Sequence, residues 1–276
     1  MDGWWELVGC PHCCGELRPG KGGEAVCSHC GAAFALRGGI PDLWHPEDRR
    51  RLIGRVKAAD PWAWPAGCAP PSPGLAAQMR RETCRALLRL LAEEGPAPEE
   101  GPVAVLGGNI GWLGRCLAEK GYHVLALEAL AGENGAEDAP PADGAPQKYI
   151  LAWGHAEHPP LRAGRFCLIV LEGSLYHVQN VPAALQRLAG GLQTQGRLIL
   201  MDTPLGPQWP VAMEHGGRLL RRDQLHEELV AAGLRPRWIE LPRGLHWWRY
   251  TARAWLRAEP WFELPLVVAY RAPKRR

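Results

Sequence analysis

One stretch of the sequence, residues 103–128, restricts the fold more than any other. An apolar run, VAVLG, is followed by a glycine-rich turn, a helical segment over about 111–120 and a second apolar run that ends at Glu128. A strand, a glycine turn, a helix and a second strand in this order are typical of a β-α-β unit, whose two strands lie parallel. We therefore expect an α/β fold built on a parallel sheet.

The residues that follow repeat this alternation. Further strands are predicted at 148–152, 165–172 and 197–202, with a helix at 182–192, and the segments PRWIEL and ELPLVVAYR are predicted to close the sheet as an antiparallel pair. A helix over 75–94 precedes the first strand, and Asp223 is expected to cap a later helix. The prediction is a Rossmann-like, seven-stranded, mostly parallel sheet with helices on both faces. A small N-terminal zinc ribbon (1–45) and a linker with a helical segment (46–100) precede this domain (101–276).

Four cysteines near the N-terminus form two CxxC pairs, Cys10 with Cys13 and Cys27 with Cys30. Each spacing lets two thiolates converge from one turn, and two such turns complete the tetrahedral shell that Zn²⁺ accepts from sulfur. Cys14 is out of register and is expected to be a spectator. Because four sulfurs leave no open coordination position, the zinc is predicted to be structural. A redox dithiol is the alternative, and an open metal site for hydrolysis is disfavoured.

The composition of the chain bears on its cellular location and on the partners it can bind. Apolar residues make up 46% and charged residues 22%, as in ordinary globular proteins. The first residues lack the pattern of a secretion signal, and no apolar run approaches the ~18 residues that span a bilayer. We expect a cytoplasmic, soluble protein without stable membrane insertion. The net charge of +3 is too small to require a polyanionic partner, although the C-terminal part is the more basic.

The glycine-rich turn predicts a ligand site. Glycines at the end of a strand leave a bare backbone where a ligand can approach amide groups, and Glu128 could accept hydrogen bonds from both ribose hydroxyls of an adenosyl group. The register of the turn, GGNIGWLG from Gly107, does not match the GxGxxG of dinucleotide-binding domains.

This segment resembles motif I of class I methyltransferases, in which Gly107, Asn109 and Gly111 occupy the three glycine places of GxGxG. The resemblance implies that S-adenosylmethionine lies on Gly107, Gly108, Asn109 and Gly111, with Glu128 on the ribose. The passage from CPHCCGEL to GIPDLW is similar to the zinc-ribbon leader of some bacterial methyltransferases, including rRNA guanine methyltransferases.

Residues 154–202 and the later DQLHEELVAAGL resemble the second half of the same family. In that pattern an acid and a small residue contact adenine, which places His155 and Ala156 there, and Glu172 ends the next strand at the cofactor. The chain departs from the pattern at Asn109, at His155, at Cys167 where an aspartate is usual, and at 131–147, where a loop replaces a helix. These departures keep open an alternative, a catalytically silent scaffold protein with a degenerate cofactor site.

His177, in GSLYHVQN, is the candidate proton acceptor, because it follows a strand end near the expected methyl group, beside Glu172 and Tyr176. A histidine packed under the lip of the site is the alternative, and His215 is a second candidate.

The methyl acceptor is either RNA or a small molecule. RNA is favoured by the ribbon and by the segment 246–257, in which Arg249, Arg253 and Arg257 recur among tryptophans at helical spacing; the alternative is a helix whose tryptophans pack on the sheet. Small metabolites are favoured by the modest net charge. The sequence carries no prediction of oligomeric state.

Overall fold

The computed structural model describes residues 4–37, 40–50, 73–107, 112–129, 148–206, 220–241 and 264–271, together with residues 248, 249, 252 and 256. Its helical elements are η1 (Trp4–Glu6), α2 (Pro73–Glu94), η2 (Pro98–Glu100), α3 (Trp112–Glu119), η3 (Leu175–His177), α4 (Val181–Gly191) and α5 (Arg222–Ala231). Its strands are β1 (Leu17–Pro19), β2 (Ala25–Cys27), β3 (Ala33–Phe34), β4 (Leu36–Arg37), β5 (Ile40–Pro41), β6 (Val103–Gly107), β7 (Val124–Glu128), β8 (Tyr149–Trp153), β9 (Phe166–Glu172), β10 (Leu192–Met201), β11 (Leu234–Ile239) and β12 (Leu266–Arg271).

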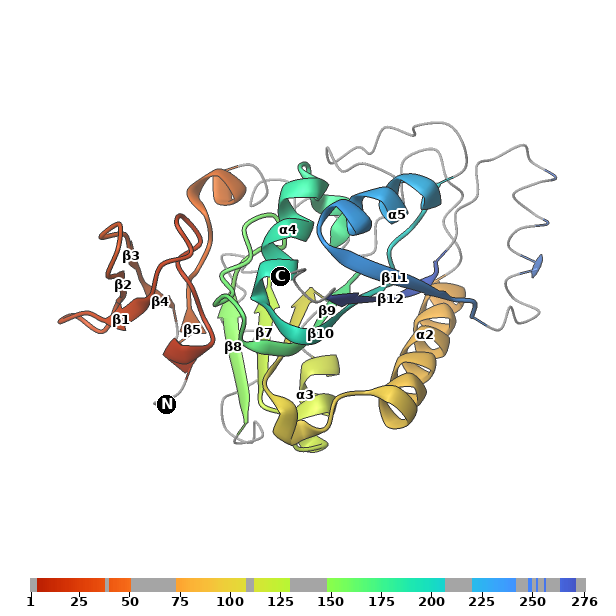
Figure 1. Cartoon of the computed structure of the whole chain (residues 1–276), viewed down its shortest axis with the longest axis horizontal. Helices are drawn as coiled ribbons and strands as arrows, with labels where there is room; N and C mark the ends of the chain where they lie inside the picture. The colour runs from red at the N-terminus through yellow and green to blue at the C-terminus, as the bar shows by residue number, and fades with distance from the viewer. Residues whose placement is uncertain are drawn as a thin grey trace.

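Seven strands form one sheet in the order β11-β12-β10-β9-β6-β7-β8 (Figure 1). The pairs from β10 through β8 are all parallel, and β12 is antiparallel to both β10 and β11. The predicted seven-stranded, mostly parallel sheet with a closing antiparallel pair is confirmed. The chain order of the strands reverses between β6 and β9. In open α/β sheets, ligands bind beyond the carboxyl ends of the strands at such a point.

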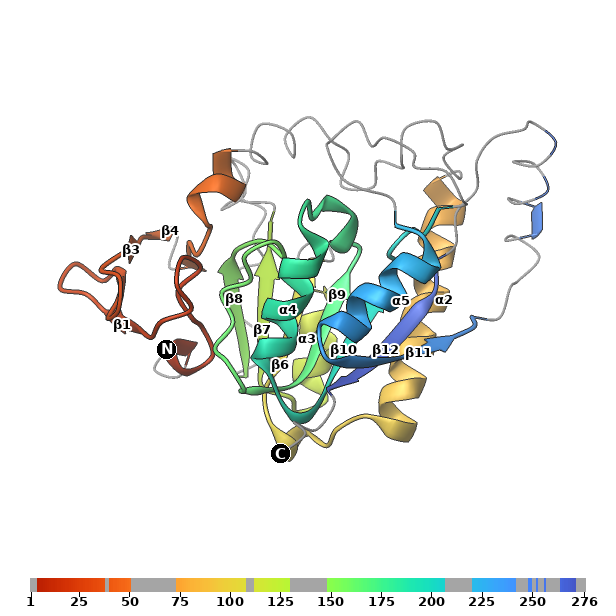
Figure 2. The ribbon, with the colours of Figure 1, turned by 45° about the horizontal axis from the view of Figure 1, so that its top comes forward.

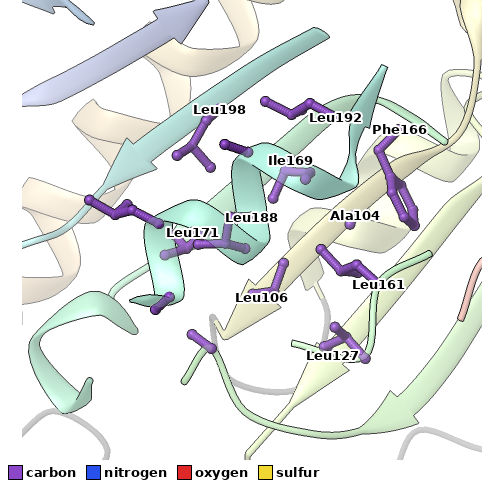
Figure 3. Packing of buried hydrophobic residues seen from close by; sticks show 14 of the residues in the cluster. Ala104, Leu106, Leu127, Leu161, Phe166, Ile169, Leu171, Leu188, Leu192 and Leu198 are labelled. Atoms are coloured by element: carbon purple, nitrogen blue, oxygen red, sulfur yellow. The ribbon is translucent and has the colours of Figure 1, made fainter. Parts of the chain in front are cut away.

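Both faces of the sheet are buried, which explains why its strands are apolar without alternation. Helices α4 and α5 cover one face and α2 and α3 cover the other (Figure 2). Leu188 of α4 lies over strands that carry Leu106 and Leu171 (Figure 3). On the opposite face, Leu87 of α2 and Leu117 of α3 are fully buried. The core therefore fixes the positions at which the strands end.

The N-terminal residues form a small unit of very short strands. Strands β1, β2 and β3 make an antiparallel sheet, and β4 and β5 make a separate antiparallel pair. Strands of two or three residues bury little surface by themselves, so this unit needs another source of stability.

This unit packs against the large sheet at β8 (Figure 1). Asp42 pairs with Trp153 in a parallel bridge, and the Leu43 amide donates to the Trp153 carbonyl at 2.8 Å. Val8 pairs with Leu161 in an antiparallel bridge. The buried side chains of the N-terminal unit and those of the α4 face belong to one continuous cluster. The two parts of the chain therefore share a core.

Several boundaries differ from those predicted, and two of them have a visible structural reason. Strand β10 begins at Leu192 instead of 197, with a register shift between Leu192 and Arg197 and a left-handed Gln195 (φ 67°). Helix α5 has Arg221 and not Asp223 at its N-cap, because the Arg221 amide donates to Gln224 one turn later. The predicted loop at 131–147 and residues 51–72 of the predicted linker lie outside the described residues. Within the described part of the chain, no helix is long and apolar enough to cross a membrane.

Candidate functional site

The carboxyl ends of β6 and β9 meet at Gly107. This residue has φ +82°, a conformation that side chains rarely adopt, and it stands opposite Glu172 in the parallel register. A Cβ added at Gly107 would lie 2.6 Å from the Glu172 carbonyl oxygen and 3.0 Å from the Ser174 Cβ. Gly107 is thus required for close approach of the two chain segments. The other predicted turn residues, Gly108, Asn109 and Gly111, lie outside the described residues.

Glu128 ends β7 directly beside this point. The register pairs Leu106 with Leu127, so Glu128 is the neighbour of Gly107 across the β6–β7 pair. The side chain is only 4% exposed. Burial, and then the charge of Glu128, raise the pKa of the Tyr149 phenol to about 12, so the two groups lie within electrostatic reach. The predicted ribose-binding acid is therefore at the edge of the sheet where the prediction requires it.

Besides Glu128 at the end of β7, two further carboxylates lie at or just after the ends of the adjacent strands β9 and β10. Glu172 ends β9 and is 5% exposed, and Asp202 follows β10 with φ +51°. Burial, followed by the charges of Glu172, Cys116 and Asp202, raises the pKa of Cys84 on α2 to about 11. Helix α2 therefore passes close to these strand ends. Asp202 was not predicted as a site residue, although its position after the apolar run RLILM is the same signal that identified Glu128 and Glu172.

His155 and Ala156 lie in the loop that follows β8, and both are buried. The His155 ring stacks on the Trp44 indole, with ring centroids 5.8 Å apart and an interplanar angle of 12°. Its Nδ1 accepts the Glu157 amide at 3.1 Å. One face of the predicted adenine-contacting side chain is therefore packed against a residue that follows the N-terminal unit.

Glu157 is a residue that sequence reasoning missed. Its Oε2 accepts the Gln179 amide at 2.6 Å and its Oε1 accepts the Asn180 amide at 2.8 Å, at the start of α4. Arg187 on the same helix donates to the Glu157 carbonyl at 2.8 Å. The loop after β8 is thus held to α4 by one side chain and one carbonyl. These partners are some 20 to 30 residues away along the chain, so no local pattern indicates them.

His177 lies in η3, on the segment that leaves β9. Its amide donates to the Ser174 carbonyl at 3.2 Å, and the Ser174 hydroxyl donates to the Leu106 carbonyl at 3.2 Å. The turn that carries His177 is therefore anchored to the end of β6, and the side chain is half-buried. This geometry agrees with the predicted location of His177 but leaves its chemical role a prediction. His215 lies outside the described residues.

The four predicted zinc ligands are gathered in one place. The Sγ atoms of Cys10, Cys13, Cys27 and Cys30 all lie within 4.8 Å of one another, with Cys10 3.7 Å from Cys30 and Cys13 3.5 Å from Cys27. Sulfurs at 2.3 Å from a tetrahedral zinc are about 3.8 Å apart. The spacing therefore fits zinc, and it is far longer than a disulfide bond. Cys14 is exposed and stands outside the group.

Backbone amides prepare one of these thiols for a metal. Burial alone would raise the pKa of Cys27, but hydrogen bonds from the Cys30 and His29 amides bring it down to about 6. Those amides lie 3.5 and 3.4 Å from the sulfur. Because the thiolate is the form that binds metal, these amides favour coordination by Cys27, whereas burial raises the pKa of Cys10 in the same group.

Part of the basic aromatic segment is described. Trp248 and Arg249 are exposed helical residues, and Trp248 is 60% exposed. The alternative in which the tryptophans of this segment pack on the sheet is therefore wrong for Trp248. The remaining arginines and tryptophans of 246–257 lie outside the described residues.

A sequence profile of the methyltransferase domain family matches residues 75–255, more than half of the chain. No curated protein matches the chain by sequence. An S-adenosylmethionine-dependent methyltransferase from Mesorhizobium loti has 18% sequence identity and a TM-score of 0.52, over 71% of this chain and 100% of that chain. The 1,6-didemethyltoxoflavin-N1-methyltransferase of Burkholderia thailandensis, solved with its substrate and S-adenosylhomocysteine, has 18% identity and a TM-score of 0.53, over 94% of this chain and 100% of that chain. At these identities the structural likeness concerns the fold.

Proposed function

The chain belongs to the methyltransferase domain family, and from this membership we propose that it binds S-adenosylmethionine at the carboxyl edge of its sheet and uses it to methylate an acceptor. One observation carries the proposal: Gly107, which has no side chain, is flanked there by the buried carboxylates Glu128 and Glu172. This arrangement supplies a strand end without a side chain, and negative charge, at the point where the strand order reverses.

The charge of the site suits the proposed cofactor. S-adenosylmethionine supplies a methyl group from a positively charged sulfonium. Buried carboxylates at the ends of β7, β9 and β10 favour a cation nearby, because opposite charges attract strongly where water is excluded.

Each side chain has a defined part in this proposal. Glu128 accepts hydrogen bonds from the ribose hydroxyls, and Glu172 lies at the opposite side of Gly107. His155 and Ala156 border the adenine, with His155 held in place by its stack on Trp44. This stack occupies one face of the imidazole ring and fixes its orientation.

Methyl transfer is an in-line displacement, so the protein has to align the acceptor and, for a protonated acceptor, remove a proton. We propose that His177 accepts this proton. Its turn is anchored to the end of β6 through Ser174. A neutral imidazole is a suitable base near pH 7.

The zinc of the N-terminal unit is proposed to be structural. All four coordination positions are taken by cysteine sulfurs, so no position is open to a substrate. The metal replaces the core that strands of two or three residues cannot build.

RNA is the acceptor class that we favour, because the exposed Trp248 and Arg249 offer a stacking surface and a positive charge side by side. A small-molecule acceptor would make this surface irrelevant to activity.

Calorimetric titration with S-adenosylmethionine and S-adenosylhomocysteine tests the proposal. Micromolar binding of both is expected. Absence of binding to folded, zinc-loaded protein would overturn it in favour of the silent scaffold, for which the departures at Asn109, His155 and Cys167 would then be the reason.

A further inference from the structure

A second group of metal-binding side chains lies where the N-terminal unit meets the large domain. His45, Glu47 and His158 each offer a ligand atom, and these atoms lie within 4.8 Å of one another. The rings of His45 and His158 are stacked, with centroids 4.1 Å apart and an interplanar angle of 16°. Two imidazoles and one carboxylate form a ligand set that zinc accepts in three-ligand sites.

The hydrogen bonds of His158 leave it ready to bind a metal. Its Nδ1 lies 2.9 Å from Oδ2 of Asp48, whose side chain is 2% exposed. When Asp48 is the acceptor of this hydrogen bond, Nδ1 is the donor, and in the neutral imidazole Nε2 then carries the lone pair. Metal-binding histidines usually donate their second ring nitrogen to a carboxylate in this way, which fixes the ring and strengthens the ligand.

His45 also has a lone pair to offer. Its Nδ1 accepts the Glu47 amide at 3.3 Å, a long hydrogen bond that a metal could replace. The His45 ring is half-buried and the Glu47 side chain is exposed, so an ion can reach the group from solvent. Ligand atoms around a tetrahedral zinc lie about 3.3 Å apart. Closing the present spacing to that value requires the exposed Glu47 side chain and the two imidazoles to move toward one another.

A neighbouring group is already satisfied by the protein. Asp48, His155 and Glu157 also lie within 4.8 Å of one another, and all are buried. However, both oxygens of Glu157 accept backbone amides, and the Glu157 amide donates to His155 Nδ1. Glu157 therefore holds the loop after β8 to the start of α4, and Asp48 is linked to the first group through His158.

We propose that His45, Glu47 and His158 form a second zinc site, with Asp48 as the carboxylate that orients His158. The site joins the segment after β5 to the loop after β8. The His12 ring, from between two ribbon cysteines, lies 5.1 Å from His45, so the site borders the cysteine cluster. With three protein ligands, the fourth position is held by water, and the metal binds less tightly than in the four-sulfur site.

Metal content of the full-length protein tests this site. The wild type, dialysed against zinc, should hold about two zinc ions per chain, and Glu47→Ala and His158→Ala should each hold about one. His226→Ala is the matched control, because His226 lies on α5 and is bonded to Trp238, and it should hold as much zinc as the wild type. Glu47 is exposed, so its removal does not threaten the fold.

Cobalt gives a second readout that separates the two sites. Thiolate-to-cobalt charge transfer reports the cysteine cluster alone, whereas a site of nitrogen and oxygen ligands adds only weak visible bands. In a cobalt titration, the wild type should therefore bind a second equivalent while the charge-transfer intensity stays constant. Glu47→Ala should not bind that second equivalent. One metal ion per wild-type chain, or an unchanged second equivalent in Glu47→Ala, would overturn the proposal. Either result leaves cofactor binding at the sheet edge untouched.

Discussion

Gly107 and Glu172 stand opposite one another across the parallel pair β6 and β9, and no Cβ fits between them. The close contact brings the end of β6 against the backbone carbonyl of Glu172, the residue that ends β9. It also makes this corner of the sheet sensitive to any added side-chain atom.

Gly107→Ala is expected to destabilise the protein and to weaken cofactor binding. Alanine at φ +82° is strained by about 1 kcal/mol or more, and its Cβ would meet the Glu172 carbonyl oxygen at 2.6 Å. Urea unfolding measures the loss of stability. Gly190→Ala is the control, because nothing lies within 4 Å of a Cβ at that helical position. If Gly107→Ala and Gly190→Ala are equally stable, the strain expected at residue 107 is absent.

Glu128→Ala is expected to weaken S-adenosylmethionine binding tenfold or more, about 1.4 kcal/mol, because the ribose hydroxyls lose their acceptor. Calorimetry measures the affinity. Glu119→Ala, at an exposed position at the end of α3, should bind like the wild type. An unchanged affinity in Glu128→Ala would mean that another acid contacts the ribose.

Cys27→Ala is expected to lose the zinc of the cysteine cluster and to lower the stability of the whole chain. Leu17 and Phe34 of the N-terminal unit belong to the same core as Leu106, so loosening one part removes contacts from the other. Metal analysis and urea unfolding followed by tryptophan fluorescence measure both effects. Cys14→Ala serves as control and should keep its zinc. If the large domain unfolds at the same urea concentration in Cys27→Ala and in Cys14→Ala, the shared core contributes little to its stability.

Cys167 is expected to resist alkylation in the folded protein at pH 8. Burial, then the charge of Glu100, raises the pKa of this thiol to about 12, and the thiolate is the reactive form. Because the pKa is raised, the thiol stays protonated well above neutral pH. Its sulfur also donates to the Gly101 carbonyl at 3.2 Å. Mass spectrometry of peptides should show labelling of Cys167 only after unfolding, and rapid labelling of the native protein would mean that the start of β9 opens.

Binding to RNA is expected to fall steeply as salt is added, since neutralised phosphates release counterions. Replacing Trp248 and Arg249 together by alanine should lower the affinity and reduce the salt slope. Filter binding at several salt concentrations measures both. A flat salt response in the wild type would point to a small-molecule acceptor.

The large sheet was predictable because its signals are local. Strands such as VAVLG and RFCLIVLE are buried on both faces, so each reads as a continuous apolar run, and an acid directly after such a run marks the edge of the sheet. The cysteine pairs were predictable for the same reason, since each pair lies within one turn. The early start of β10 was not, because Leu192 pairs before an irregular register that no periodicity indicates.

The less predictable features depend on contacts between distant segments. The stack of Trp44 on His155 joins residues more than a hundred positions apart, and the hydrogen bonds of Glu157 depend on where α4 begins. Neither Trp44 nor Glu157 lies in a sequence pattern that predicts its contact. The family resemblance marked His155 as a departure, whereas the structure supplies a reason for a flat ring at that position.

The two outer strands of the large sheet are protected in different ways. Strand β11 carries Pro236, which has no amide hydrogen, between the exposed Arg235 and Arg237, and such residues discourage a foreign strand from adding to an edge. Strand β8, with the sequence YILAW, has neither charge nor proline, and its last residue is instead paired with the ribbon through Asp42 and Leu43. If the cysteine cluster holds zinc, loss of that metal would loosen the segment that pairs with Trp153, and the end of β8 would then be open to pairing with a foreign strand.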